Sequence, residues 1–393
     1  MSSDLPNGWR RVRAGDVFRE RKQKGREGLP VASVSIEHGL VLRSSLDRRI
    51  QSDLLPEGHS LVRKGDIAYN MMRMWQGACG LAEADCLISP AYVVMTPTEE
   101  IEPQFADKLL RSQQVIRLLH GYSQGIVDDR LRLYPDAFAQ VPISLPPLDE
   151  QRQIATVLRS VDQAIAAGQR VAEQAEAVWH GLTERLIWDR LSKGPEMARP
   201  LGQALQRTDY GVNAPLGNEP TGYAVLRMGN LQDGWIEPAE LRWGEIADAE
   251  AKALALEVGD ILFNRTNSRD LVGKVALVRQ PTDFLYASYI VRLRVNRSVA
   301  DPYYLFAVMH SRRAQARFKS IATPGVSQSN INPTNLKKQV IPLPSLAEQR
   351  DIGSQLQSVE TVRRTALDEV MRSRQIKSDL MSDLLSGRVR VPK

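Results

Sequence analysis

The sequence LPPLDEQRQI at residues 145–154 returns as LPSLAEQRDI at residues 343–352, which is 198 positions further along a chain of 393. Seven of the ten positions are identical, and each copy opens a long stretch without internal proline. Solenoid repeats recur every 20–50 residues or so, so a repeat of this length indicates a duplicated domain followed by a helix. The chain is therefore expected to consist of two copies of one module.

Both copies carry signals for the start of a helix. Pro147 and Pro344 hold the preceding chain extended. In the second copy Ser345 and Glu348 form an S-x-x-E capping box, which predicts that the helix begins there. In the first copy Glu150 keeps the acidic position near the positive end of the helix dipole.

The residues after each start have helical periodicity. In the first copy apolar or small residues step four and three positions apart, which is a heptad seam typical of a helix packed along one partner helix: Ile154, Leu158, Val161, Ile165, Gly168, Ala172, Ala175, Trp179, Leu182 and Leu186. The second copy is looser, is interrupted by Arg363 and Arg374, and places these residues on or near one face: Ile352, Leu356, Val359, Val362, Ala366, Val370, Ile376, Leu380 and Leu384.

These two stretches predict two long helices. About 40 residues make a rod of roughly 60 Å. Each helix alone could be an ordinary core element. Two such helices, one after each half of the chain, favour an antiparallel pair that sets the distance between two globular domains.

Length and composition allow two or three globular domains. The chain has 42% hydrophobic and 25% charged residues and a formal net charge of +6. A positive net charge favours a polyanionic partner without requiring one. The spacing of Cys79 and Cys86 fits neither a zinc knuckle nor a redox pair, so we expect buried free thiols in a reducing compartment. The first residues lack the apolar core of a signal peptide, and no apolar run is long enough to cross a membrane. We expect a soluble, cytoplasmic protein.

The second half of the chain retraces the first. KGDIAYN at residues 64–70 matches VGDILFN at residues 258–264, and SQGIVDDRLRL from residue 123 matches TPGVSQSNINP from residue 323. Strand-like runs at residues 31–36, 65–69 and 91–95, with a helical run at 106–119, indicate a mixed α/β (α+β) domain. The matched positions are glycines, prolines and apolar residues that a fold requires, whereas polar loops differ. The fold class is therefore α/β (α+β), with two similar domains and two long antiparallel helices in a pseudo-twofold internal repeat.

Motifs for catalysis are missing from the sequence. It has no phosphate-binding P-loop and no glycine-rich dinucleotide fingerprint. The tetrapeptide typical of amino-methyltransferases is also missing, and residues 332–335 are the nearest approach. The five histidines are scattered without ligand spacing. We therefore expect a protein that is not an enzyme by itself and binds no metal.

Two pairs of polar loops are candidates for reading DNA, because Arg can read guanine and Asn or Gln can read adenine. The first pair follows the two G-D strands and offers Asn70, Arg73 and Gln76 in one copy and Asn264, Arg265, Asn267 and Arg269 in the other. The second pair offers Gln124, Gly125, Asp128 and Arg130, and Gly325, Ser327, Gln328 and Asn330. The two glycines suggest a sharp turn or a close approach. The alternative is that these are solvated turns and plain hairpins. Basic stretches at residues 10–13, 43–49 and 312–319 are candidates for phosphate contact or ordinary surface charge.

A strand-rich domain followed by a proline-led E-Q-x-x-I helix, with both then repeated, resembles the specificity subunit of type I restriction-modification systems. The two proline-led helix starts, the G-D strands at Gly65 and Gly259 and the terminal SDLLSGRVRV at residues 382–391 carry this resemblance, which covers essentially the whole chain. It implies target recognition domains at 1–144 and 193–342, with spacer helices at 145–192 and 343–393.

The resemblance also implies partners. The two helices would form a coiled coil that docks two methyltransferase subunits, and two restriction subunits could join them. S-adenosylmethionine would then be bound by the former and ATP with Mg by the latter, with no cofactor in this chain. The helix starts are the implied docking positions: Glu150, Gln151, Arg152 and Ile154, and Glu348, Gln349, Arg350 and Ile352.

The sequence therefore favours a non-catalytic subunit that reads a bipartite target in double-stranded DNA, with no membrane partner. Two alternatives stay open: a self-contained nuclease or DNA methyltransferase with an unrecognised site, and a scaffold that binds proteins only.

Overall fold

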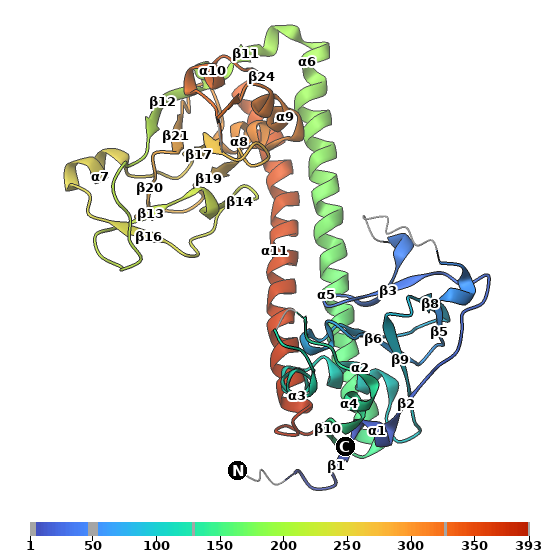
Figure 1. The fold of residues 1–393 in the computed structure, drawn as a ribbon. Helices are drawn as coiled ribbons and strands as arrows, with labels where there is room; N and C mark the ends of the chain where they lie inside the picture. The colour runs from blue at the N-terminus through green and yellow to red at the C-terminus, as the bar shows by residue number, and fades with distance from the viewer. Residues whose placement is uncertain (1–4, 46–53, 128–129, 326–327, 392–393) are drawn as a thin grey trace. The chain divides into compact units, whose positions relative to one another are not determined.

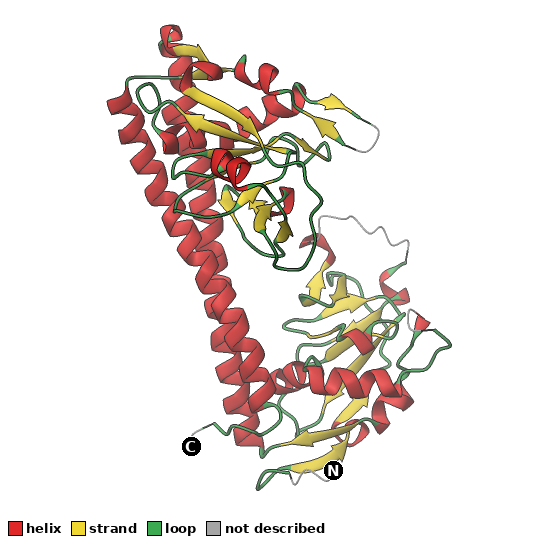
Figure 2. Cartoon of the chain, turned by 90° about the vertical axis from the view of Figure 1, so that its left-hand side faces the viewer, coloured by secondary structure: helices red, strands yellow, loops and turns green. Residues whose placement is uncertain are grey.

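The computed structural model describes residues 5–45, 54–127, 130–325 and 328–391. The chain forms two compact units. Unit 1 comprises Met1–Gly168 and Asp368–Lys393, and unit 2 comprises Gln169–Leu367. Each unit therefore contains one segment of each of the two long helices, α5 and α11, and in both views the two segments lie side by side (Figures 1 and 2).

Unit 1 is built on a four-stranded antiparallel sheet in the order β2-β9-β6-β7, with bounds Phe18–Glu20, Tyr92–Pro97, Ile67–Asn70 and Cys79–Leu81. Three two-stranded pairs accompany it: β1 (Arg10–Arg13) with β10 (Pro142–Leu145), β3 (Ala32–Ser35) with β4 (Gly39–Leu42), and β5 (Ser60–Val62) with β8 (Cys86–Ile88). Its shorter helices are α1 (Ala14–Val17), α2 (Pro103–Leu110), α3 (Gln113–Tyr122) and α4 (Pro135–Gln140).

Unit 2 repeats this plan. Its four-stranded sheet has the order β12-β21-β17-β19, with bounds Leu205–Tyr210, Ile290–Val295, Ile261–Asn264 and Val275–Leu277. The pair β11 (Ala198–Pro200) and β24 (Val340–Pro342) matches β1 and β10. Its shorter helices are α7 (Asp248–Leu254), α8 (Pro302–His310), α9 (Arg312–Ser320) and α10 (Pro333–Lys337). The same strand order in both units confirms the duplication.

Unit 2 also has small sheets of its own. One contains β16 (Arg242–Gly244), β13 (Tyr223–Leu226) and β20 (Leu285–Tyr286), and another is the hairpin of β14 (Leu231–Gln232) and β15 (Trp235–Ile236). A third contains β18 (Thr266–Asn267), β23 (Ser329–Asn330) and β22 (Thr323–Pro324).

The repeated G-D pair before β6 and β17 has the same structural role in both units. Gly65 and Gly259 have φ of 91° and 95°, a left-handed conformation that glycine adopts without steric cost. The next residue, Asp66 or Asp260, is buried, and its carboxylate accepts a backbone N–H three residues earlier at 2.9 Å. Each carboxylate also pairs with an arginine of its own unit. The pair therefore closes the turn that leads into the central strand.

The single helix expected at residues 106–119 is wrong, because the structure has two helices there. α2 ends at Leu110, and Ser112 caps α3 by accepting the N–H of Val115 at 3.3 Å. The Ser112 hydroxyl also donates to the carbonyl of Leu109 at 2.7 Å. A capping serine inside an apolar period therefore broke the expected helix.

The two expected long helices are confirmed. α5 runs from Leu148 to Thr183, continues through one π turn at Glu184–Trp188, and is followed by α6 (Asp189–Lys193). α11 runs from Leu346 to Leu384. Ser345 and Glu348 make the expected capping box, since the backbone N–H of Ser345 donates to Glu348 at 3.1 Å and that of Glu348 donates to the serine hydroxyl at 3.4 Å.

The heptad seam of α5 is confirmed, because every seam residue is buried or half-buried. In unit 1 ion pairs join Glu150 to Arg390 and Asp162 to Lys377. The residue numbers increase along α5 while those of the partners in the C-terminal segment decrease. In unit 2 the pairs that join Glu176 to Arg363 and Arg190 to Glu348 show the same order. The helix segments within each unit are therefore antiparallel.

The expected face of α11 is wrong at two positions. Val362 and Ile376 are both 52% exposed. Arg363 and Lys377 lie inward instead, and they reach Glu176 at 3.6 Å and Asp162 at 2.6 Å. Long cationic side chains can cover an apolar seam with their methylene stems while the charge finds a partner, which a count of apolar residues overlooks.

The two helices are not confined to either unit. The predicted division at 144, 192 and 342 separates the helices from the globular parts, whereas compactness divides each helix between the units. The assignment of recognition domains and spacers therefore stays a prediction about function.

Cys79 and Cys86 are buried free thiols, and burial raises the pKa of Cys86 to about 11. Among the described residues, no helix is long and apolar enough to span a membrane.

Candidate nucleic-acid interface

In unit 1 the structure brings the two predicted loops together. The backbone N–H of Leu133, just after the second loop, donates to the carbonyl of Met71 in the first loop at 2.9 Å. Gln124 and Arg132 pair across the second loop through two backbone hydrogen bonds of 2.9 Å. The two loops therefore form one surface, although they are about 50 residues apart in the sequence.

Unit 2 joins its loops by the equivalent bond. The backbone N–H of Ile331 donates to the carbonyl of Arg265 at 2.8 Å. Strand β18 then pairs with β23, so the first loop continues into a small sheet with the second. The side chain of Asn330 accepts from Arg265 at 3.1 Å and donates to Thr266 at 2.9 Å. Unit 2 therefore joins its two loops by strand pairing and side-chain hydrogen bonds in addition to the equivalent backbone bond.

The unit 1 candidates differ in the solvent exposure and hydrogen bonding of their side chains. Arg73, Gln76, Gln124 and Arg130 are exposed. Asn70 is half-buried, and its carboxamide oxygen accepts the N–H of Met72 at 2.9 Å, so it shapes the turn. Asp128 lies outside the described residues.

In unit 2 fewer candidates reach solvent. Arg269 and Gln328 are exposed, whereas Asn264 is fully buried and Asn267 is 8% exposed. The buried pair cannot contact a base edge in this conformation. Arg265 and Asn330 are half-buried and bonded to one another, and the Arg265 guanidinium lies 5.1 Å from the centre of the Tyr210 ring. Ser327 lies outside the described residues.

The two loop glycines allow a close approach. A β-carbon at Gly125 would lie 2.9 Å from the carbonyl oxygen of Arg130, and one at Gly325 would lie 2.6 Å from that of Gln328. Neither glycine has a positive φ. Each therefore lets the two arms of its own hairpin pass close together.

The sequence reading missed the apolar residues of these loops. Ile126 is completely exposed, and Val127 and Met72 are each about half exposed. Apolar side chains at a groove can contact the thymine methyl group. Tyr210, which is 51% exposed beside Arg265, was also missed. An adjacent pair of β-branched residues directly after a loop glycine was the available signal for Ile126 and Val127.

The residues at the helix starts divide into buried and exposed ones. Gln151 and Gln349 are at most 1% exposed, Ile154 and Ile352 at most 3%, and Glu150 is 8% exposed and paired with Arg390. Their side chains are inside their own units and are not available to a partner. Arg152, Glu348 and Arg350 are exposed. Docking at these positions stays a prediction, and only the exposed residues can serve it directly.

The buried glutamines make the same three hydrogen bonds in both units. Gln151 donates to the carbonyls of Glu100 and Pro146 at 3.2 and 3.0 Å, and its oxygen accepts the N–H of Glu102 at 2.9 Å. In unit 2 the corresponding partners of Gln349 are Val299 and Pro344, at 3.1 and 2.8 Å, and Asp301, at 2.9 Å. In each unit this glutamine therefore connects the long helix to the loop before α2 or α8 by hydrogen bonds.

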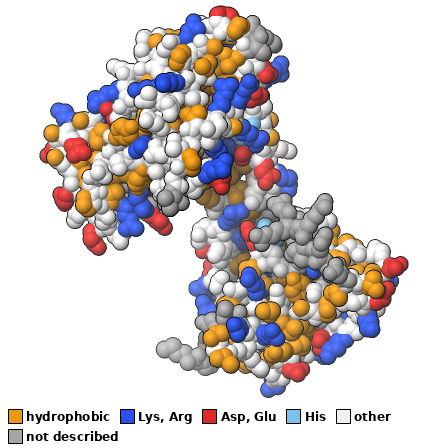
Figure 3. Space-filling view, turned by 45° about the horizontal axis from the view of Figure 1, so that its top comes forward, with side chains coloured by type: hydrophobic (Ala, Val, Ile, Leu, Met, Phe, Trp, Pro, Cys, Tyr) orange, Lys and Arg blue, Asp and Glu red, His pale blue; other side chains and the backbone are white. Residues whose placement is uncertain are grey.

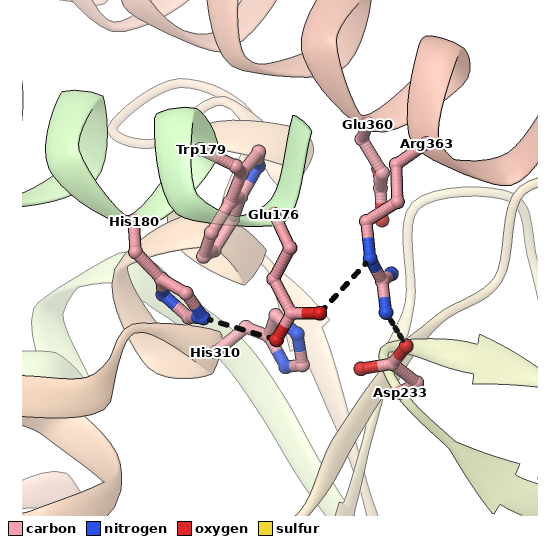
Figure 4. Close-up of a pocket in the computed structure, with 7 residues that line it drawn as sticks. All are labelled: Glu176, Trp179, His180, Asp233, His310, Glu360 and Arg363. Carbon is pink, nitrogen blue, oxygen red and sulfur yellow. Dashed lines mark hydrogen bonds and ion pairs between the residues drawn. The ribbon is translucent and has the colours of Figure 1, made fainter. Parts of the chain in front are cut away.

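A small pocket in unit 2 is lined by several titratable side chains (Figure 4). Glu176 lies between His180, at 3.7 Å, and Arg363, at 3.6 Å, and Arg363 also pairs with Asp233. Burial lowers the pKa of His310 to about 4 and also lowers that of His180. The pocket has a volume of about 20 Å³. A space of that size admits a single water molecule. These groups therefore join the hairpin β14–β15 to the long helices.

Charge on the units is mixed. Lys and Arg side chains are spread over both units on the face that Figure 3 shows, with hydrophobic side chains between them. No group of three or more His, Cys, Asp or Glu within the described ranges is arranged to hold a metal ion. Contact of the paired loops with DNA stays a prediction.

The chain is similar to known proteins over most of its length. Residues 215–377 match a family model described as the type I restriction modification DNA specificity domain. The putative type I restriction enzyme MjaX specificity subunit of Methanocaldococcus jannaschii is 31% identical over 192 residues, which are 48% of this chain and 45% of that protein. The EcoKI specificity subunit of Escherichia coli K12 is 21% identical over 323 residues, 77% of this chain and 69% of that protein. The chain thus spans about half the length of the first of these relatives.

Solved structures show the same fold. The S subunit of a type I restriction-modification system from M. genitalium has a TM-score of 0.64 at 12% identity, with 98% of this chain and 97% of that chain covered. A chain from a structure of type I R-M system assembly has a TM-score of 0.52 at 18% identity, with 98% and 99% covered. The duplicated sheet, the paired helices and these similarities agree: the chain is similar to type I restriction-modification specificity subunits in sequence and in fold.

Proposed function

We propose that this chain is the non-catalytic subunit that reads a bipartite DNA sequence for a type I restriction-modification complex. Unit 1 reads one half of the target through the loops at residues 70–77 and 123–130. Unit 2 reads the other half through the loops at residues 264–269 and 323–330. Exposed Arg and Gln side chains of these loops contact base edges.

One observation carries this proposal: a single scaffold occurs twice with different loops at the same place. Leu133 to Met71 and Ile331 to Arg265 are equivalent hydrogen bonds, yet the side chains around them differ in type and exposure. Two different surfaces on one scaffold suit the reading of two different sequences.

The partners follow from the family. The exposed surfaces of α5 and α11 dock two methyltransferase subunits, which bind S-adenosylmethionine, and restriction subunits that use ATP and Mg join the complex. The chain itself needs no cofactor and works in the cytoplasm, where host DNA is modified.

Exchange of residues 264–269 for an unrelated loop tests the modular reading. The complex with methyltransferase subunits should then methylate a motif that is changed in one half only. Methylation mapped by sequencing gives the motif. A change in both halves would contradict separate reading by the two units.

Two single substitutions sharpen this experiment. Arg73→Ala should relax one half of the motif and Arg269→Ala the other, because each removes an exposed guanidinium from one unit. Arg63→Ala is the matched control, since Arg63 is exposed on a turn away from both loops. Relaxation of the same half by both variants would refute the assignment.

The alternatives have their own assay. Turnover by the purified chain with DNA, magnesium and S-adenosylmethionine would support a self-contained enzyme. A reconstituted complex without any DNA sequence preference would support a scaffold that binds proteins only.

A further inference from the structure

Trp188 fills a groove in unit 2. Its side chain lies at the end of the π turn that follows α5, is 1% exposed, and donates its indole N–H to the hydroxyl of Ser311 at 2.9 Å. The guanidinium carbons of Arg313 and Arg317 lie 5.3 and 5.1 Å from the ring centre. Arg317 also donates to the carbonyl of Val340 in β24, at 3.1 Å. The groove between α9 and β24 is thus filled by an aromatic ring with two arginines of α9 beside it.

Unit 1 has the same groove without the ring. It lies between α3 and the pair β1–β10, has a volume of about 320 Å³, and is lined by Arg11, Leu109, Gln114, Val115, Arg117, Leu118, Pro142, Ile143, Ser144 and Leu385. The repeat aligns Gln114 with Arg313, Leu118 with Arg317 and Leu385 with Ile187. The position that corresponds to Trp188 is Ser386, which is too small to fill the space.

The two grooves share the group that receives the indole. Ser112 caps α3 as Ser311 caps α9, and each hydroxyl donates to the carbonyl three residues earlier. In unit 2 the hydroxyl oxygen also accepts the Trp188 N–H. Among the described residues, Ser112 receives no such side-chain donor.

The arginines that line the unit 1 groove do not stand at the repeat positions of Arg313 and Arg317. Arg11 and Arg117 take the places of Ala198 and Ala316 in the repeat. Both side chains are exposed, and neither has an ion pair within the part of the chain that the structure describes. In unit 2, by contrast, Arg313 is paired with Glu184 of the segment that carries the tryptophan. An occupant of the unit 1 groove would therefore gain from carrying acidic residues beside its aromatic ring.

We propose that this groove of unit 1 is a docking site for a partner protein, which inserts a tryptophan flanked by acidic residues. A cavity of about 150 Å³ already holds a benzene ring. The groove is about twice as large, so its size agrees with an indole ring. A second copy of this chain is a poor occupant, because its own Trp188 is buried. The proposal goes beyond DNA reading and does not depend on it.

A peptide of this chain's own residues 182–191, LTERLIWDRL, is the probe. A second peptide carries R185E and R190E, which add acidic charge, and a third also carries W188A. Calorimetric titration of the full chain without DNA should show that the acidic tryptophan peptide binds at least tenfold more tightly than the unmodified one. The W188A peptide should not bind measurably.

Variants of the chain locate the site. R11E with R117E should weaken binding of the acidic peptide at least tenfold, whereas R63E, a single charge reversal at an exposed arginine elsewhere on unit 1, should leave it unchanged. Ser144→Trp should block the groove, and circular dichroism with thermal melting checks that each variant is folded. Equal binding to the R11E/R117E and R63E chains would overturn the proposal, as would equal binding of the W188A peptide or no binding of the acidic peptide.

Discussion

Units 1 and 2 share one buried framework, called the frame below, and differ in their loops and in one groove. Both have the sheet of four strands in one order, the buried Gln151 or Gln349, and the glycine–aspartate turn. They differ in the two loops at one edge of the unit and in the groove beside α3 or α9. The buried Gln151 or Gln349 and Asp66 or Asp260 are repeated, whereas the loop side chains that reach solvent are not.

The difference separates two kinds of requirement. A buried carboxamide or carboxylate needs all its partners, because an unsatisfied buried polar group costs free energy. A second copy of the frame therefore retains them together with the bonds they make. A loop side chain in water has no such constraint and can be replaced without unfolding the unit.

The largest expected effect on stability comes from the groove of unit 2 that Trp188 fills. Trp188→Ala should destabilise unit 2 by about 4 kcal/mol, since it leaves a large cavity and removes a buried hydrogen bond. Ser386→Ala, the matched change in unit 1, should have an effect close to zero. Native-state hydrogen exchange of amides in α8 and α9, compared with those in α2 and α3, measures each unit separately. Equal losses in both units would contradict the assignment of Trp188 to unit 2.

The buried glutamines should give a smaller and symmetrical effect. Gln151→Ala and Gln349→Ala each remove the three hydrogen bonds of a buried carboxamide. Each should therefore cost about 3 kcal/mol in its own unit. The same exchange experiment measures both. Gln163→Ala, an exposed change on α5, is the control. An effect in only one unit would show that the two frames are not energetically equivalent.

The smallest effect depends on pH and belongs to unit 2. The pKa of His310 falls to about 4 when the chain folds, from an ordinary value of 6.5, because of burial and the nearby charges of His180 and Arg279. The unfolded chain therefore binds more protons between these values, so unit 2 should lose stability as the pH falls from 6.5 to 4. Part of the His310 residue still meets solvent, so we expect a loss on the order of 2 kcal/mol.

His310→Phe should flatten this dependence, because the ring would keep its stacking on Phe306 without a titrating group. Glu176, Asp233, Glu360 and Arg363 also line the pocket. Chemical denaturation of the wild type and the variant at several pH values gives the comparison. The same slope in both would exclude His310 as its source.

Much of the fold could be predicted from the sequence. The repeated helix starts, the heptad seam and the G-D turns are local patterns with direct physical meaning, and each has its expected place. The division of the helix at Ser112 and the inward turn of Arg363 and Lys377 could not be predicted. The positions of the two cations depend on partners distant in sequence, Glu176 and Asp162.

The candidate site was less predictable. Residue type marked Asn264 and Asn267 as candidate base contacts, but burial depends on how β17 and β18 pack, which composition does not reveal. Ile126 was overlooked because an apolar residue is usually read as core, and only the coordinates show that it is wholly exposed. The groove of unit 1 was invisible for a similar reason: it exists because one position carries serine where its repeat carries tryptophan.

The composition of unit 1 from two separate segments has a consequence for synthesis. Gln169–Leu367 is continuous, so a ribosome has produced all of unit 2 before it makes the residues that complete unit 1. Leu384 and Leu385 enter the core of unit 1, and Arg390 reaches Glu150 and the carbonyl of Asn7. Although its sequence comes first, unit 1 is therefore the later of the two to mature, and it must wait with an uncovered apolar surface until its final helix segment arrives.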